Sequence, residues 1–232
     1  DDQAQSLGYD VRNWFEVLDA LGAYTGTGAF GDVNDNTEFL SRTGDALACR
    51  FPNGAVAIAP HLRTYVETWP GGFGRDREED ARHMAENPPP PFTLDLQDFR
   101  VNGHTVTFSG EGAIAFRVDD AGALIAFAGG GQEVTIDGRT TVFADQPIGQ
   151  LAWAPVLEER KVEGGALLQA MVYGQGTVRF PAPYLPDRVK VYAQGGQPGS
   201  RGAEAPCRME DGVLVIEVGP DTTGRWLFAA AE

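Results

Sequence analysis

Residues 93–108, TLDLQDFRVNGHTVTF, decide the fold, because two strand-like stretches there flank the dipeptide Asn102-Gly103. Apolar and polar residues alternate on both sides of the dipeptide, and alternation of period two is the pattern of a β-strand with one face buried. Asn-Gly is also the dipeptide that best fits the left-handed backbone of a two-residue hairpin turn. The stretch therefore predicts an antiparallel β-hairpin.

The same pattern continues on both sides of this hairpin. Towards the C-terminus, AIAFRV and ALIAFA flank DDAG, and EVTI and RTTVFA flank Asp137-Gly138. Towards the N-terminus, EFLSR and ALACRF lead through PNG into the apolar run AVAIA, which predicts a strand buried on both faces. Further strands follow residue 165, so the chain has a dozen or more. Thirty glycines and fifteen prolines suit many short strands joined by tight turns.

This strand count predicts a mainly-β fold with two antiparallel β-sandwich-like domains in series. Open sheets rarely exceed about ten strands, so two sandwiches explain the count better than one sheet. We place the first sandwich at residues 37–150 and a smaller second one at residues 151–232. Residues 75–86, RDREEDARHMAE, are strongly charged and predict a short surface helix within the first sandwich.

An amphipathic helix is predicted before the strands, within residues 1–36. In DVRNWFEVLDALG, apolar residues recur at helical spacing, Asp10 can cap the start and Gly22 can end it. The apolar stripe consists of Trp14, Phe15, Leu18 and Leu21 together with Val11. One helix cannot hide such a stripe from water, so we expect it to dock on a partner. We favour a catalytic domain or a second subunit over the alternative, which is the first sandwich of the same chain. The segment would then be the end of that domain or the element that docks to it.

Composition excludes several functional classes. The 232 residues carry a formal net charge of −15, which argues against nucleic acid and anionic membrane surfaces as partners. Cys49 and Cys207 lie far apart in the sequence, and the three histidines lack metal-ligand spacing, so no metal site is predicted. No phosphate-binding loop or nucleophile elbow is present, so we expect no cofactor. Nothing in the sequence decides the compartment.

Residues 59–72, APHLRTYVETWPGG, hold the richest set of side chains. In a strand, one face would carry the candidate ligand-binding residues His61, Arg63, Tyr65, Glu67 and Trp69. Their aromatic rings could stack on sugars while the charged groups bind hydroxyls. The same face could instead dock against another domain, or it could be an ordinary solvated surface. Trp69 precedes a turn and is our first choice for a ligand contact.

Catalytic residues are not evident from the sequence. Glu38, Asp45 and Glu67 are carboxylates close to this face, and Glu38 and Glu67 are the weak candidates for catalysis. Sequence alone does not show the separation of two carboxylates that a glycosidase requires. The carboxylates of DNTE, DLQD and VDD are interpreted as turn and strand caps.

The order of these elements resembles the C-terminal part of a multidomain bacterial glycoside hydrolase. In that family the last helix of a (β/α)₈ barrel is followed by β-sandwich domains, as DVRNWFEVLDALG is here by LSRTGDALACRFPNGAVAIAPHLR, DFRVNGHTVTF, TIDGRTTVFADQPIGQLAWAPV and GRWLF. The family's catalytic glutamates lie on barrel strands, so the resemblance implies no catalytic residue here. It implies a bacterial, cytoplasmic or secreted, non-catalytic accessory region with carbohydrate as ligand. The alternatives are a free-standing β-sandwich glycoside hydrolase or lyase that uses paired carboxylates, and a structural assembly module.

Overall fold

The computed structural model describes residues 38–43, 46–50, 54–60, 82, 85–86, 93–156, 165–196 and 200–232. The predicted helix with Trp14, Phe15, Leu18 and Leu21 lies outside these residues. The strands are β1 (Glu38–Thr43), β2 (Ala46–Arg50), β3 (Val56–Pro60), β4 (Thr93–Val101), β5 (His104–Glu111), β6 (Ile114–Val118), β7 (Leu124–Gly131), β8 (Glu133–Ile136), β9 (Arg139–Val142), β10 (Ile148–Pro155), β11 (Ala166–Tyr173), β12 (Gly176–Pro181), β13 (Val189–Gln194), β14 (Arg201–Ala205), β15 (Cys207–Glu210), β16 (Val213–Val218) and β17 (Trp226–Ala231).

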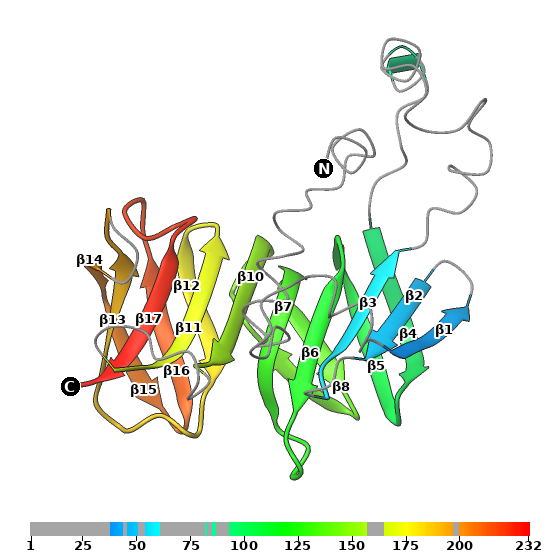
Figure 1. The fold of residues 1–232 in the computed structure, drawn as a ribbon, viewed down its shortest axis with the longest axis horizontal. Helices are drawn as coiled ribbons and strands as arrows, with labels where there is room; N and C mark the ends of the chain where they lie inside the picture. Colours follow the sequence, from blue (N-terminus) through cyan, green and yellow to red (C-terminus); the bar gives the residue numbers. More distant parts are fainter. Residues whose placement is uncertain are drawn as a thin grey trace.

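The described strands form three sheets (Figure 1). The largest has ten strands in the order β1-β2-β3-β6-β7-β10-β11-β17-β13-β14, and the smaller ones have the orders β12-β16-β15 and β4-β5-β8-β9. Every strand pair is antiparallel. The prediction of a mainly-β chain with antiparallel sheets is confirmed.

The predicted hairpins form around residues that tolerate a left-handed backbone. Asn102 and Gly103 join β4 to β5 with φ angles of 47° and 82°, and Asp137 and Gly138 join β8 to β9 with φ angles of 51° and 76°. Between β6 and β7, the Asp119 carboxylate accepts hydrogen bonds from two backbone N–H groups of its own turn at 2.9 and 2.8 Å. Local turn chemistry therefore sets these connections, as the sequence predicts.

Strand β3 is buried on both faces, as its apolar sequence predicts. Val56, Ala57 and Ile58 of the strand, and Ala55 just before it, are each at most 2% exposed. The strand pairs with β2 on one side and with β6 on the other, so it lies inside the ten-stranded sheet. An interior strand with both faces covered has no position for a polar side chain, which explains the unbroken apolar run.

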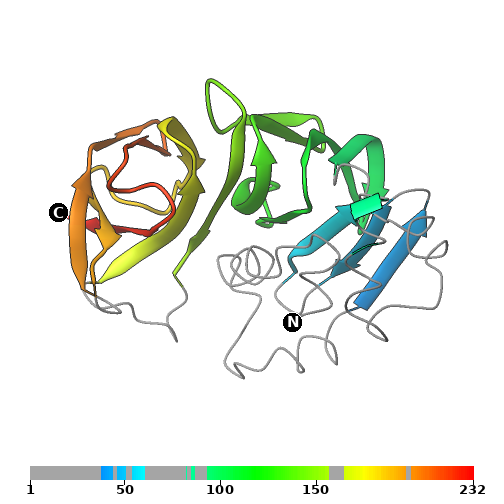
Figure 2. The same cartoon turned by 90° about the horizontal axis from the view of Figure 1, so that it is seen from above.

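The two smaller sheets pack on different parts of the large one. The four-stranded sheet contacts β3 and β7, whereas the three-stranded sheet contacts β13 and β14. Figure 2 shows these layers as two halves that meet at β10. Most of their buried side chains belong to one large apolar cluster, and Ala166, Tyr192, Phe228 and Ala230 form a second, small one. Trp153 of β10 belongs to the large cluster, with its ring centroid 5.5 Å from that of Phe127 and 5.0 Å from that of Phe180.

The predicted division of the chain near residue 150 falls inside β10. That strand pairs with β7 on one side and with β11 on the other, so the large sheet is continuous across the position. That residues 37–150 and 151–232 fold as two separate domains therefore stays a prediction. Within the predicted surface helix, Arg82, Ala85 and Glu86 are helical and exposed. No helix in the described part of the chain has the length and apolar character needed to cross a membrane.

Candidate functional site: a polar groove

The site residues predicted from sequence cannot be compared with the described geometry. His61, Arg63, Tyr65, Glu67 and Trp69 lie outside the described residues, as does Asp45. Glu38 begins β1, and its backbone pairs in register with Arg50. Its side chain is not among the described parts of the structure. The proposed recognition face thus remains a prediction, and the described structure points to a different candidate.

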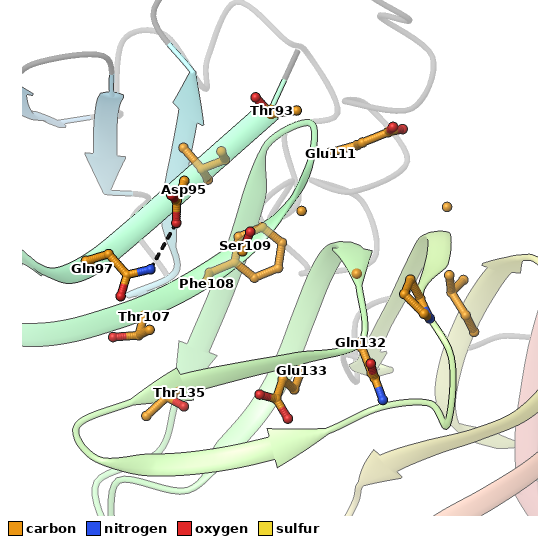
Figure 3. Close-up of a pocket in the computed structure, with 16 residues that line it drawn as sticks. Thr93, Asp95, Gln97, Thr107, Phe108, Ser109, Glu111, Gln132, Glu133 and Thr135 are labelled. Carbon is orange, nitrogen blue, oxygen red and sulfur yellow. Dashed lines mark hydrogen bonds between the residues drawn. The ribbon is translucent and has the colours of Figure 1, made fainter. Parts of the chain in front are cut away.

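That candidate is a groove of about 950 Å³ at one end of the four-stranded sheet. Strands β5 and β8 pair at Val106↔Ile136 and Thr107↔Thr135, and beyond these pairs they diverge. The β4–β5 hairpin meanwhile remains paired as far as Thr93↔Glu111. The groove opens in the space between the two diverging strands (Figure 3). Its lining consists of Thr93, Leu94, Asp95, Gln97, Thr107, Phe108, Ser109, Gly110, Glu111, Gly131, Gln132, Glu133, Thr135, Pro147, Ile148 and Gly149.

Glycines allow three backbone segments to meet beneath the groove. A Cβ atom on Gly130 would lie 2.5 Å from the carbonyl oxygen of Gly149 and 3.1 Å from that of Glu111. A Cβ atom on Gly110 would lie 2.9 Å from the carbonyl oxygen of Gly130. These distances exclude a side chain, so β5, β7 and β10 approach each other only because the positions are glycine. Gly130, within the run AGGGQ at residues 128–132, is thus a close-packing position at the groove's base.

Strand alternation places polar side chains on the β4–β5 wall. Leu94 and Leu96 are 3% exposed and belong to the core, so their neighbours Thr93, Asp95 and Gln97 point outward. Ser109 and Glu111 are likewise exposed on β5, in register with Asp95 and Thr93 respectively. The amide of Gln97 donates a hydrogen bond of 3.0 Å to the Asp95 carboxylate and holds its orientation.

The opposite wall is formed by β8 and the residue before it. Figure 3 shows Gln132, Glu133 and Thr135 on the other side of the groove from the β4–β5 wall. Gln132 donates a 3.2 Å hydrogen bond to the backbone carbonyl of Asp145, and the Thr135 hydroxyl lies 2.8 Å from that of Thr140. These bonds orient two of the three side chains, while the Glu133 carboxylate is exposed.

Among the described residues, the ionisable groups of the groove are all acidic. They are Asp95, Glu111 and Glu133, and no described lysine, arginine or histidine lines the groove. The ion pairs formed among described residues involve other carboxylates, those of Asp137, Asp145, Glu210, Glu217 and Glu232. No three described carboxylate, histidine or cysteine side chains lie close enough to hold a metal ion. A ligand here would meet hydroxyls, amides and carboxylates.

The groove resembles a binding surface more than a catalytic centre. Asp95, Glu111 and Glu133 are all exposed on the outer surface of the sheet. A carboxylic acid that donates a proton near neutral pH is ordinarily shielded from water, because burial favours its protonated form. The described lining also has no exposed aromatic ring, since Phe108 is only 2% exposed. Hydrogen bonding would therefore dominate recognition within the described lining.

A second polar contact joins the turns at the far end of the same sheet. Nδ1 of His104 lies 2.8 Å from the Asp137 carboxylate, which also accepts a 2.8 Å hydrogen bond from the backbone N–H of Thr105. The rings of His104 and Phe116 pack nearly perpendicular to each other, with centroids 5.7 Å apart and an interplanar angle of 78°. The hydrogen bond from His104, helped by that from Thr105, lowers the pKa of Asp137 below its ordinary value. The pair connects the β4–β5 turn to the β8–β9 turn.

We expect Asp137→Asn to destabilise the protein by roughly 1 kcal/mol or less at neutral pH, because the pair is partly exposed. The pKa of Asp137 is lower in the folded chain than in the unfolded one. Its contribution is therefore complete above the unfolded pKa and is lost as the pH falls through the folded pKa. Urea unfolding at several pH values should show a difference between variant and wild type at neutral pH that vanishes in acid. Asp187→Asn, at an exposed position, is the control, and a difference independent of pH would contradict the linkage.

Sequence reasoning missed this groove for an identifiable reason. The interpretation of the DLQD carboxylates as turn and strand caps does not describe Asp95, because residues 95–98 lie in β4. Only Gln97 and Asp98 have no register partner there, at a bulge where Asp98 has a φ of 50°. The available signal was the polar alternation of Thr93, Asp95 and Gln97. No family model, curated protein or solved structure matches this chain. The function is therefore argued from the groove itself.

Proposed function

We propose that this chain is a non-catalytic β-sandwich accessory region of a carbohydrate-active enzyme, and that the polar groove is its glycan-binding site. The observation that carries the proposal is a groove of about 950 Å³ whose walls hold hydroxyls, amides and carboxylates on rigid strands. Grooves that hold small ligands typically measure about 300–1,000 Å³, so this one has room for several sugar rings.

The chemistry of the walls suits a ligand rich in hydroxyl groups. Carboxylates accept hydrogen bonds only, whereas threonine and serine hydroxyls and glutamine amides can both donate and accept. Sugar hydroxyls also do both, so each wall group has a possible partner on a glycan. The orienting bonds at Gln97, Gln132 and Thr135 reduce the entropy lost when such a ligand binds.

The proposal assigns catalysis to another domain. The exposed carboxylates of the groove support binding, as argued above, and the N-terminal apolar stripe of Trp14, Phe15, Leu18 and Leu21 supports docking to a catalytic domain or second subunit. In this arrangement the chain would hold a glycan near the catalytic site of its partner.

Blocking the groove tests the binding site. We expect Ser109→Trp to weaken glycan binding at least tenfold, or about 1.4 kcal/mol, because a bulky side chain would fill the space between the walls. Calorimetric titration with a panel of oligosaccharides measures the affinity of wild type and variant. Asp187→Trp places the same side chain at an exposed position in the other half and should bind like the wild type. Equal melting temperatures for the three proteins would show that the variants fold normally.

Other outcomes would favour other functions. If the wild type binds no oligosaccharide in the panel, the carbohydrate proposal fails and an assembly module becomes the better explanation. A parallel assay with chromogenic glycosides tests for hydrolysis. Activity that is lost in Glu111→Gln or Glu133→Gln would instead identify a free-standing glycoside hydrolase that uses the carboxylates of this groove.

A further inference from the structure

We propose that the outer face of the ten-stranded sheet is the docking surface for residues 10–22 of the same chain, the segment that the sequence predicts to be an amphipathic helix. Docking of this kind is independent of the groove and goes beyond the proposed function. The apolar stripe would lie on the chain's own sheet rather than on an outside partner, so the accessory role would then rest on the groove alone.

The two faces of the ten-stranded sheet differ in what packs on them. Phe116, Phe127 and Trp153 point into the large apolar cluster of the inner face. Both smaller sheets pack on this face, with ring centroids 6.4 Å apart for Phe108 and Phe127 and 5.0 Å apart for Trp153 and Phe180. The residues between the inward ones point to the outer face, because side chains alternate along a strand. Neither of the smaller described sheets packs there.

A row of alanines crosses the outer face. The register pairs Ala57↔Ala115, Ala115↔Ala128 and Ala128↔Ala152 carry the row from β3 through β6 and β7 to β10. These four side chains are at most 4% exposed, although no described sheet covers them. An apolar sheet face is buried when another layer packs on it. The low exposure therefore indicates that a further element of the protein belongs on this face.

Arg117 lies beside this row and indicates the charge of the missing element. It follows Ala115 by two residues on the same face, and it is the only charged residue in β6, β7 and β10. Its Nε atom is buried and has no hydrogen-bond partner, and the guanidinium forms no ion pair with a described residue. A partly buried cation is stabilised when an acidic group packs beside it.

Residues 10–22 match the outer face in shape. A helix of this length is about 20 Å long, and the alanine row spans three strand spacings, or about 14 Å. Methyl groups leave room above the sheet that large side chains can fill to the density of a protein interior. The stripe of the segment supplies such side chains, namely Trp14, Phe15, Leu18 and Leu21.

The same segment matches the outer face in charge. Asp10, Glu16 and Asp19 are acidic, whereas Arg12 is its only basic residue. At 3.6 residues per turn, Asp10 and Asp19 lie at the two borders of the apolar stripe. When the stripe faces the sheet, a carboxylate at either border can approach the guanidinium of Arg117.

The connection to β1 is long enough for docking within one chain. Residues 23–37 lead from the segment to β1, which is an edge strand of the large sheet. Fifteen residues span at most about 50 Å, whereas β1 and β7 are four strand spacings apart, or roughly 20 Å. A tether of this length also gives the segment a high effective concentration at its own sheet, which favours docking there over docking on a second copy.

Hydrogen–deuterium exchange of the whole chain tests the docking. We expect the amides of residues 10–22 to exchange at least about tenfold more slowly than those of a free peptide of the same sequence, in a chain that light scattering shows to be monomeric. Ala128→Glu puts a charge into the alanine row, and Leu18→Glu puts one into the stripe. Each should return residues 10–22 to the exchange rate of the free peptide. Ala203→Glu makes the same change at an exposed position of β14 and should keep the protection.

Disulfide cross-linking keeps the test decisive if Ala128→Glu does not fold. With both native cysteines replaced by serine, Leu18→Cys is combined in turn with Ala115→Cys, Ala128→Cys or Ala152→Cys, and with Ala203→Cys as control. Cysteine is only slightly larger than alanine, so these chains should fold. We expect at least one of the first three pairs to form a disulfide within a monomer, and the control pair to form none, because the bond requires Cα atoms within about 7 Å.

Three results would overturn docking on the chain's own sheet. They are rapid exchange of residues 10–22 in the wild type, protection that persists in a folded Ala128→Glu chain, and absence of a disulfide in all three pairs. Protection or cross-links found only in a dimer would likewise reject it and assign the stripe to a second copy. The glycan titration of the groove is a separate measurement, so failure of the docking and failure of the proposed function are distinguishable.

Discussion

Trp153→Ala is expected to lower the free energy of unfolding by about 3–5 kcal/mol, the usual cost of removing a large aromatic side chain from a core. Trp153 is 0% exposed and stacks on Phe180 with an interplanar angle of 15°. Phe127 and Phe143 lie beside it with centroids 5.5 Å away. These rings come from both halves of the molecule. The cavity left by the Trp153→Ala substitution would therefore loosen the packing between the halves as well as within them.

Urea unfolding followed by circular dichroism measures this effect and also tests the domain division. One shared core predicts a single transition that moves as a whole to lower urea. Two transitions, of which only one moves, would instead show that residues 37–150 and 151–232 unfold independently. Trp153→Phe is the conservative comparison. It should cost less, because it keeps a ring and also removes a buried indole N–H that has no hydrogen-bond partner among the described residues.

Gly130→Ala is expected to destabilise the protein by roughly 3 kcal/mol, at the upper end of the range for overpacking. The new methyl group would lie 2.5 Å from the carbonyl oxygen of Gly149 and 3.1 Å from that of Glu111, so β5 or β10 would have to move. Both are backbone atoms within strands, which cannot rotate away as a flexible side chain can. The shift would also displace the β5 side of the groove.

Gly219→Ala is the matched control for this prediction. A Cβ atom on Gly219 would meet nothing within 4 Å, so the stability should change by no more than about 0.5 kcal/mol. Neither glycine has a left-handed backbone, so the comparison isolates the effect of space. Thermal and urea unfolding measure both variants, and glycan titration of Gly130→Ala measures the groove. A Gly130→Ala protein as stable as the control would show that the close approach of β5, β7 and β10 is not maintained in solution.

The candidate site shows where sequence reasoning stopped. Polar alternation identified the outward face of 93–97, and the same rule applies to Ser109 and Glu111 on β5. The rule does not tell which outward faces border a groove and which meet bulk water. That depends on the divergence of β5 from β8 after Thr107↔Thr135 and on the glycines that bring β10 beneath the gap. Residues 59–72 attracted attention because of their side chains, and composition alone carries no information about shape.

By itself, the sequence determined the strand-rich character of this protein, its tight turns at Asn102-Gly103 and Asp137-Gly138, and the doubly buried strand β3. These features depend on backbone conformation and burial over a few residues, which composition and periodicity encode directly. Only the tertiary structure decided that β6 pairs with β3, that β17 lies between β11 and β13, and that one ten-stranded sheet runs through both halves. Such partners are separated by up to dozens of residues. Which strands pair depends on how whole sheet faces pack against each other. Its alternating pattern alone would let a strand pair equally well with many others.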